Sequence, residues 1–323
     1  MEPEADTLFC RLADPDAPVV EVPEHGLSAL CARARAHRVE AIMLRKLRAH
    51  SDHPAVRALS DEVLTATAFT MLLEHHAAPI AREIRARALS AAIVKGGVFA
   101  NRLYAHSEDR PWTDVDILAA PAARDDVASV LRDFGYRRAG AERSEARNRE
   151  EKWDHPQTPE LLIELHGDLV HYPSLRRGVR FGWAELTAAG RQDPQAPLAL
   201  LATAVVHATL GHKLHELRLL IDVLQAFRAL DAAERAMLPQ RMAELSLRLE
   251  AALVLGLVAE LFDVPEARAV AETIAGTGQT RLAALIIRPR DVLGADGPRL
   301  GSSHLRRHAF RWLQKLHLSR AAT

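Results

Sequence analysis

Two aspartates, Asp114 and Asp116, stand two positions apart in a short segment whose polar and apolar residues alternate. The alternation over Asp114–Leu118 predicts a strand, and residues two apart on a strand point to the same face. Two neighbouring carboxylates repel each other and raise each other's pKa unless a cation lies between them. Because Mg²⁺ prefers carboxylate and phosphate oxygens, the pair predicts a magnesium site, with Val115 and Ile117 facing the core.

A third carboxylate, Glu164, lies between apolar residues in a later predicted strand, Leu161–Leu165. If that strand pairs near the two aspartates, Asp114, Asp116 and Glu164 form a cluster that can hold two metal ions. Such a cluster neutralises a triphosphate and aligns an attacking hydroxyl in line with the leaving pyrophosphate. We therefore expect these three residues to be both the metal ligands and the catalytic residues.

A glycine turn precedes the aspartates. Gly96 and Gly97 follow a short apolar run, Ala91–Val94, and stand before a predicted helix, Val98–Tyr104. Glycines let the backbone approach a ligand closely, and the amides at a helix N-terminus bind phosphate oxygens. Taken singly, an Asp-x-Asp pair is often a solvated strand edge and a Gly-Gly pair is often a plain turn. The full order of strand, Gly-Gly, helix, strand with Asp-x-Asp, helix and strand with Glu is far more specific.

Several of these residues form a recognisable pattern. It comprises Lys95-Gly96-Gly97, Tyr104, Arg110, Thr113-Asp114-Val115-Asp116-Ile117-Leu118, Gly135-Tyr136 and Ile163-Glu164-Leu165-His166. The pattern resembles the signature of the bacterial uncharacterised nucleotidyltransferase family, within the DNA polymerase β-like superfamily. Similar stretches around His37–Leu44, His207 and Leu217–Asp222 extend the resemblance over most of residues 26–230.

The resemblance implies a Mg²⁺-dependent transfer of a nucleoside monophosphate from a nucleoside triphosphate to an acceptor, with Mn²⁺ as the alternative ion. The two aspartates would bind the metal, and Glu164 would help to activate the acceptor hydroxyl. The implied nucleotide-binding residues are Lys95, Gly96, Gly97, Arg110 and Thr113. The wider superfamily usually carries Gly-Ser after its first strand, where this chain has Lys-Gly-Gly. The acceptor is not identified; a small molecule or a natural-product peptide is favoured, and RNA stays open.

Further polar residues are candidates for the substrate cleft. His166 lies two residues beyond the third carboxylate and would share its face, while His207 and Asp222 are expected to face the substrate cleft from the helical region. His212 and His215 are more typical of polar helix faces and packing, with metal binding as the alternative reading. Their spacing does not match the His-Glu-x-x-His pattern of metalloproteases.

The elements that must position these residues predict an α+β fold that is predominantly helical. We expect an N-terminal helical region over 1–88, a minimal nucleotidyltransferase core over 89–190 and a C-terminal helical domain over 191–323. Helices are predicted over 26–50, 61–88 (kinked or split at Pro79), 122–134 (capped by Gly135), 197–210, 214–229, 231–247, 249–262, 265–276, 278–287 and 306–320. Further strands are predicted over 151–155 and 161–165, and loops over 141–151 and 291–303.

Composition narrows the class of protein. With 48% apolar residues in 323, the chain can bury a sizeable core. Lys plus Arg equals Asp plus Glu at 42 each, which gives no reason to expect a general nucleic-acid binder, although a local basic patch stays open.

Only two cysteines, Cys10 and Cys31, argue against a disulfide framework and favour a reducing cytoplasm. Met1–Pro18 lacks the apolar stretch of a signal peptide, and Ala251–Leu261 is too short to span a bilayer.

Two other functions suit the same residues. The site would also suit transfer of a pyrophosphoryl or terminal phosphoryl group. A hypothesis of another class is a nucleotide-binding or scaffold protein without catalysis.

Overall fold

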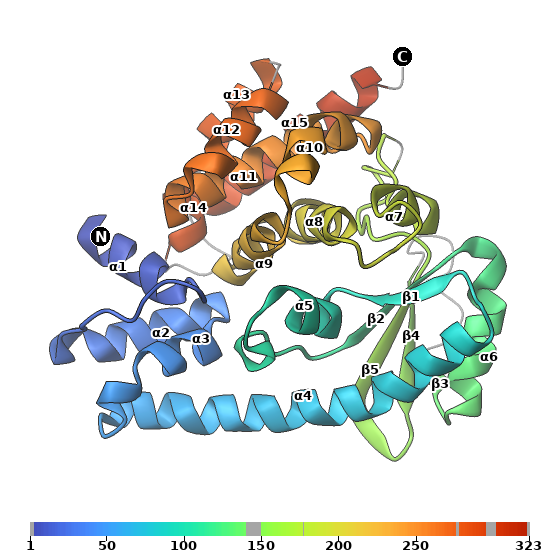
Figure 1. Cartoon of the computed structure of the whole chain (residues 1–323), viewed down its shortest axis with the longest axis horizontal. Coiled ribbons are helices and arrows are strands. Elements are labelled where there is room, and N and C mark those ends of the chain that lie inside the picture. The colour runs from blue at the N-terminus through green and yellow to red at the C-terminus, as the bar shows by residue number, and fades with distance from the viewer. Residues whose placement is uncertain (1–2, 140–149, 177, 276–277, 295–301, 322–323) are drawn as a thin grey trace.

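The computed structural model describes residues 3–139, 150–176, 178–275, 278–294 and 302–321. It shows an α+β protein in which many helices surround one small mixed sheet, as the sequence predicts (Figure 1). The predicted loop over 141–151 falls mostly outside the described residues, as does part of the predicted loop over 291–303.

The sheet has five strands. They are β1 (Ala91–Val94), β2 (Val115–Ala119), β3 (Arg137–Arg138), β4 (Glu150–His155) and β5 (Thr158–His166). Their order is β1-β2-β5-β4-β3; β2 and β5 run parallel, and every other pair is antiparallel. The sequence predicted all but β3, whose two arginines show no apolar alternation.

The two faces of the sheet have opposite character. Val115 and Ile117 belong to a buried cluster that includes the inner stripes of α4 (Pro54–Ala86) and α6 (Arg124–Asp133). Because side chains alternate along a strand, Asp116 lies on the other face. The same alternation places Glu164 on the face opposite its buried neighbours in β5. The sheet therefore turns its apolar face to two helices and its polar face to the C-terminal helices.

The N-terminal region begins with α1 (Pro3–Ala13), followed by α2 (Leu27–His37) and α3 (Glu40–Lys46), with 3-10 turns at Glu24–Gly26 and Arg48–His50. The prediction of one helix over 26–50 is wrong. Arg38 adopts a left-handed conformation with φ 56° and ends α2, so the chain changes direction before α3. Arg38 consequently lies at a corner between two helices.

The long helix α4 is continuous through Pro79, so the alternative of two separate helices is wrong. A proline inside a helix removes one backbone hydrogen bond and clashes with the preceding turn. Here Leu73, Ala77, Ile80 and Ile84 bury one stripe against the sheet on both sides of the proline. This packing holds the two halves in line.

The remaining helices surround the sheet and build the C-terminal region. They are α5 (Gly96–Leu103), α7 (Trp183–Ala189), α8 (Pro197–Val206), α9 (Leu217–Arg228), α10 (Ala232–Glu244), α11 (Arg248–Phe262), α12 (Pro265–Ile274), α13 (Gly278–Ile286), α14 (Pro289–Leu293) and α15 (Ser302–Ala321). Short 3-10 turns cover Ser107–Asp109 and Pro121–Ala123, and a π-helical turn, His207–Gly211, follows α8. The sequence predicted most of these helices but missed α1, α7 and α14. Gly135, with φ 84°, follows α6 as the predicted cap.

The larger hydrophobic core joins the two ends of the chain. Phe9 and Leu27 from the N-terminal helices belong to the same buried cluster as Leu220 and Val254 from the C-terminal helices. Sequence boundaries at 88 and 190 therefore do not coincide with separate hydrophobic cores, and the three-domain division stays a prediction.

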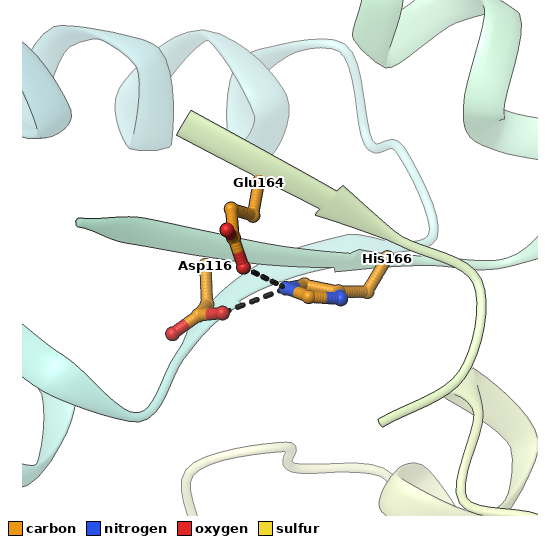
Figure 2. Close-up of side chains that lie close together, drawn as sticks. All are labelled: Asp116, Glu164 and His166. Carbon is orange, nitrogen blue, oxygen red and sulfur yellow. Dashed lines mark hydrogen bonds and ion pairs between the residues drawn. The ribbon is translucent and has the colours of Figure 1, made fainter. Parts of the chain in front are cut away.

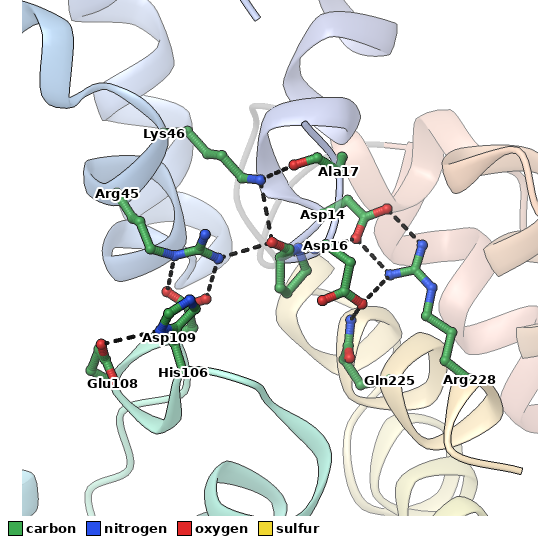
Figure 3. A network of polar contacts seen from close by, with 11 residues as sticks. Asp14, Asp16, Ala17, Arg45, Lys46, His106, Glu108, Asp109, Gln225 and Arg228 are labelled. Atoms are coloured by element: carbon green, nitrogen blue, oxygen red, sulfur yellow. Dashed lines mark hydrogen bonds and ion pairs between the residues drawn. The ribbon is translucent and has the colours of Figure 1, made fainter. Parts of the chain in front are cut away.

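Polar contacts reinforce this junction (Figure 3). Arg228 of α9 forms ion pairs with Asp14 at 2.6 Å and Asp16 at 2.9 Å, which fixes the segment after α1. On the other side of that segment, the guanidinium of Arg45 in α3 binds Asp109, with Nε 3.1 Å from Oδ1. Asp109 directly precedes Arg110, so this pair anchors the loop that leads into β2.

Across the described part of the chain, no helix combines the length and apolar character that crossing a membrane requires.

Candidate active site

A cavity of about 290 Å³ opens over the polar face of the sheet. Its floor includes Lys95 at the end of β1, Asp116 in β2 and Glu164 in β5. Its opposite wall includes His207 in the π-helical turn and Arg218 in α9. The cavity therefore lies where the sheet meets the C-terminal helices.

The sheet brings two of the three predicted carboxylates together. In the parallel pair of β2 and β5, Asp116 stands directly beside Glu164. Asp114, the residue before β2, lines the same cavity. One ligand atom each from Asp116, Glu164 and His166 can be chosen so that all lie within 4.8 Å of one another (Figure 2). Among the described residues, this is the only grouping of three such side chains that could hold a metal ion.

Asp116 is the most tightly held of these carboxylates. Lys95 Nζ and His166 Nε2 each lie 2.7 Å from its Oδ1 atom. Burial alone would raise the pKa of Asp116, but the nearby Lys95 and His166 outweigh it and lower the pKa below its usual range. Lys95 itself has φ 56°, a conformation that non-glycine residues rarely adopt. Strain of this kind gathers at functional sites.

Asp114 has the opposite electrostatic character. Burial, together with the neighbouring charges of Asp116 and Glu164, raises its pKa to about 6 despite the opposing charge of Lys95. A cation beside Asp114 would offset the part of this rise that comes from the two neighbouring carboxylates. The donor set of Asp116, Glu164 and the His166 imidazole fits a divalent cation, with Asp114 in the same cavity, and its oxygens suit Mg²⁺ or Mn²⁺.

Glu164 forms an ion pair with a residue of the neighbouring strand β4. Lys152 in β4 stands opposite Glu164 across the antiparallel pair, and its Nζ lies 3.1 Å from Oε1. His166 Nε2 lies 3.5 Å from Oε2, so the imidazole faces both Asp116 and Glu164. These contacts hold Glu164 next to the Lys95–Asp116 ion pair, and Glu164 itself forms no ion pair with Lys95.

The glycine turn serves packing as well as the cavity. α5 begins at Gly96 itself, two residues earlier than predicted, and Gly96 lines the cavity whereas Gly97 does not. The indole of Trp112 lies against both glycines, and a Cβ atom on Gly97 would come within 2.8 Å of its Cζ2 atom. Gly97 is therefore required by the close approach of Trp112, and the first turn of α5 is held at the cavity wall.

Arg110 and Asp222 form a buried ion pair. Arg110 donates from Nε and Nη2 to the two carboxylate oxygens of Asp222, at 2.7 and 2.8 Å. The Tyr104 hydroxyl donates to the same carboxylate at 2.7 Å. Asp222 is fully buried and does not line the cavity, whereas Arg110 and Thr113 reach its wall. Burial would lower the pKa of Arg110, but Asp222 raises it beyond its usual range.

Histidines line the cavity opposite the carboxylates. The rings of His207 and His212 lie 4.7 Å apart, and both line the cavity, as does His171. Burial lowers the pKa of His212 to about 4 and that of His171 to about 3, so these imidazoles are neutral. Burial also lowers the pKa of His207 well below its usual value. His215 instead binds Glu216 at 3.1 Å, and neither His212 nor His215 joins a metal-competent group among the described residues.

Sequence reasoning missed five cavity residues: Arg38, Glu150, Lys152, His171 and Arg218. Glu150 is the first residue of β4, one residue before the predicted start of that strand. The signal for Lys152 was present, because the β4–β5 hairpin was predicted and its register places a cross-strand partner opposite Glu164. The other three come from loops and helices whose places relative to the sheet depend on packing over the whole chain.

Comparison with known protein families gives one match. The family described as uncharacterised nucleotidyltransferase matches residues 23–263, a span that includes the whole sheet and most of the cavity wall. The chain therefore belongs to that family and is a transferase. A search among curated proteins found no match.

Proposed function

We propose that this member of the uncharacterised nucleotidyltransferase family transfers a nucleoside monophosphate from a nucleoside triphosphate to an acceptor hydroxyl or phosphate. The observation that carries the proposal is the pairing of Asp116 with Glu164 across parallel strands, with Asp114 in the same cavity. Asp114, Asp116 and Glu164 are the proposed metal ligands, with Mg²⁺ as the ion and Mn²⁺ as the alternative.

The metal, when bound, neutralises phosphate charge and aligns the reacting oxygens. The protein supplies the rest. Asp116 is held ionised by Lys95 and His166, which keeps a ligand ready for the cation. Glu164 is the proposed base for the acceptor proton, because it lies beside the aspartates and faces the same cavity.

The proposed nucleotide-binding residues act in different ways. Lys95, Gly96 and Thr113 line the cavity, and the first amides of α5 offer N–H groups to phosphate oxygens. Gly97 acts through the packing of Trp112, and Arg110 through its pairing with Asp222. His207 lines the cavity wall, His166 acts through its contact with Asp116, and Asp222 positions Arg110 through two hydrogen bonds.

The acceptor belongs to a class that the cavity admits: a small molecule, a peptide side chain or an RNA end. Cys10 and Cys31 are both buried free thiols, which fits a cytoplasmic protein.

The reaction is tested with α-labelled and γ-labelled nucleotides, Mg²⁺ and an extract of the host cell. Transfer of the α label to an acceptor, lost in Asp114→Ala, supports the proposal. Transfer of the γ label alone would instead indicate phosphoryl or pyrophosphoryl transfer, which the mass added to the acceptor separates. Binding of nucleotide without either transfer would indicate a non-catalytic protein.

A further inference from the structure

A second hollow adjoins the active-site cavity and shares Arg38, Trp112, Thr113 and Arg218 with it. This hollow, here called the Trp112 lobe, has a volume of about 120 Å³. It lies between α3, α4 and the segment that leads into β2. A ligand in the main cavity can therefore extend past Arg218 into the lobe.

The Trp112 lobe has apolar walls that include two aromatic side chains, and it has an acidic end. Val63, Ala66 and Phe69 of α4 face the lobe together with Trp112. Glu40 and Glu62 also line it. Glu62 is engaged by Arg35 at 2.7 Å, whereas Glu40 has no ion pair among the described residues. A carboxylate only accepts hydrogen bonds, so the group that fits beside Glu40 is a planar ring that carries N–H donors.

The junction of the two hollows is positively charged. Arg218 has a side chain that is 13% exposed; one Nη donates to Glu216 at 3.2 Å, while its buried Nε has no hydrogen-bond partner. Burial lowers the pKa of Arg218 to about 10, with a smaller contribution from the nearby Arg110. Lys95 and Arg110 already bind carboxylates, so an anion at the junction meets Arg218 and Arg38 first.

The two sides of the main cavity carry different residues. The strand order β1-β2-β5-β4 puts Lys95 and Asp116 at one side and Glu164 and Lys152 at the other. If Glu164 takes the acceptor proton, the acceptor occupies the β5–β4 side. The nucleotide then extends away from it, toward Thr113 and the Trp112 lobe.

We propose that the Trp112 lobe binds the nucleobase of the nucleoside triphosphate, favouring bases that carry an amino group, while Arg218 and Arg38 bind the polyphosphate. This assignment rests on the proposed nucleotidyl transfer and adds to it the site that selects the base. Stacking of the base on Trp112 or Phe69 supplies affinity, and Glu40 supplies the preference for N–H donors.

Calorimetric titration of the full chain tests the assignment without turnover. The ligands are ATP, GTP, CTP, UTP and inorganic tripolyphosphate, each with Mg²⁺; tripolyphosphate has charge but no base. Ala66→Trp fills the lobe from α4, and Ala68→Trp is the matched control because Ala68 is exposed on the same helix.

We expect Ala66→Trp to weaken binding of nucleoside triphosphates roughly 10- to 100-fold, the range expected for loss of one stacked base. Binding of tripolyphosphate should not change, and Ala68→Trp should bind all ligands like the wild type. Arg218→Gln should weaken nucleotide and tripolyphosphate alike. Unchanged nucleotide affinity in a folded Ala66→Trp variant would overturn the assignment.

Glu40→Gln gives an independent measurement if the tryptophan variant does not fold. It should reduce the preference for amino-bearing bases over UTP, and an unchanged ratio would overturn the assignment. A wild-type chain that binds tripolyphosphate as tightly as any nucleotide would overturn the assignment but leave the proposed function standing. A wild-type chain that binds neither ligand would overturn both.

Discussion

The described residues include two buried ion clusters, one around Arg110 and one around Asp116. They differ in how fully the charges of their members are paired. In the Arg110 cluster, one guanidinium and one hydroxyl converge on the single carboxylate of Asp222.

In the Asp116 cluster, four carboxylates line the cavity. Asp116 pairs with Lys95, and Glu150 and Glu164 share Lys152. Asp114 has no ion pair among the described residues. A cluster whose charges are all paired stabilises a particular arrangement of the chain. A cluster with an unpaired charge can bind an ion from solution.

The position of each cluster agrees with this difference. Asp222 is inaccessible and joins α9 to the loop before β2, so the Arg110 cluster fixes one wall of the cavity. The Asp116 cluster faces the cavity itself. The same residue types therefore have different roles, and the distinction depends on the number of partners and on access to the cavity.

The largest expected effect is on catalysis. Asp116→Asn should lower the rate of nucleotidyl transfer on the order of 10³-fold or more, because it removes the charge that would hold the cation. The measurement is the initial rate of α-label transfer, with circular dichroism to verify folding. Asp126→Asn, an exposed residue in the first turn of α6, is the matched control and should keep full activity. Equal rates for both variants would remove the Asp116 cluster from the reaction.

The Arg110 cluster should instead control stability. Asp222→Asn leaves the Arg110 guanidinium buried without its counter-ion, which should lower the free energy of unfolding by about 3–5 kcal/mol in urea denaturation. Glu83→Gln, which breaks an exposed pair with Arg87, should leave the denaturation midpoint almost unchanged. An Asp222→Asn variant as stable as the wild type would contradict a structural role for this cluster.

Asp114 should make metal binding depend on pH. Its pKa is raised to about 6, so the folded protein holds a proton that the unfolded chain loses at lower pH. Between these two pKa values the contribution of Asp114 to stability falls as the pH rises, and above about pH 6 the ionised group is a net cost that a cation relieves. We expect Mg²⁺ to raise the Tm by about 2–4 °C at neutral pH and by less at about pH 5.

Asp114→Asn provides the control for that dependence. It removes the repulsion from Asp116 and Glu164, so without metal it should be at least as stable as the wild type at neutral pH. It should also lose most of the rise in Tm caused by Mg²⁺ at every pH. A stabilisation by Mg²⁺ that is the same above and below pH 6 would show that Asp114 does not bind the ion.

The smallest expected effect is that of Arg218, whose contacts differ from those of Arg110. Arg218→Gln should lower the free energy of unfolding by only about 1 kcal/mol, because it loses one Nη contact with Glu216 while the buried Nε has no partner to lose. Arg110→Gln, the same substitution in the matched cluster, should destabilise by about 3 kcal/mol or more. Equal losses in a urea denaturation series would mean that Arg218 is as fully matched as Arg110.

The predictions from sequence succeeded where the evidence is local. The alternation around Asp116 defined a strand with an apolar and a polar face, and β1 was predicted with its observed bounds. The prediction failed at Arg38, where a left-handed residue ends a helix without a glycine or proline to mark it. It also did not assign the partner of Arg110, because Asp222 lies 112 residues further along the chain.

The sequence by itself determined the family, and with it the class of transferase, and it predicted the residues that we propose as metal ligands. Strand periodicity and the order of the motifs depend only on neighbours along the chain. Tertiary structure alone decided how each charge is paired: it joined Arg110 to Asp222 through two hydrogen bonds, and it left Arg218 with one contact, to Glu216, at the junction of the two hollows. The physical reason is that the effect of a charge depends on its burial and its partners, and both are set by segments far apart in sequence.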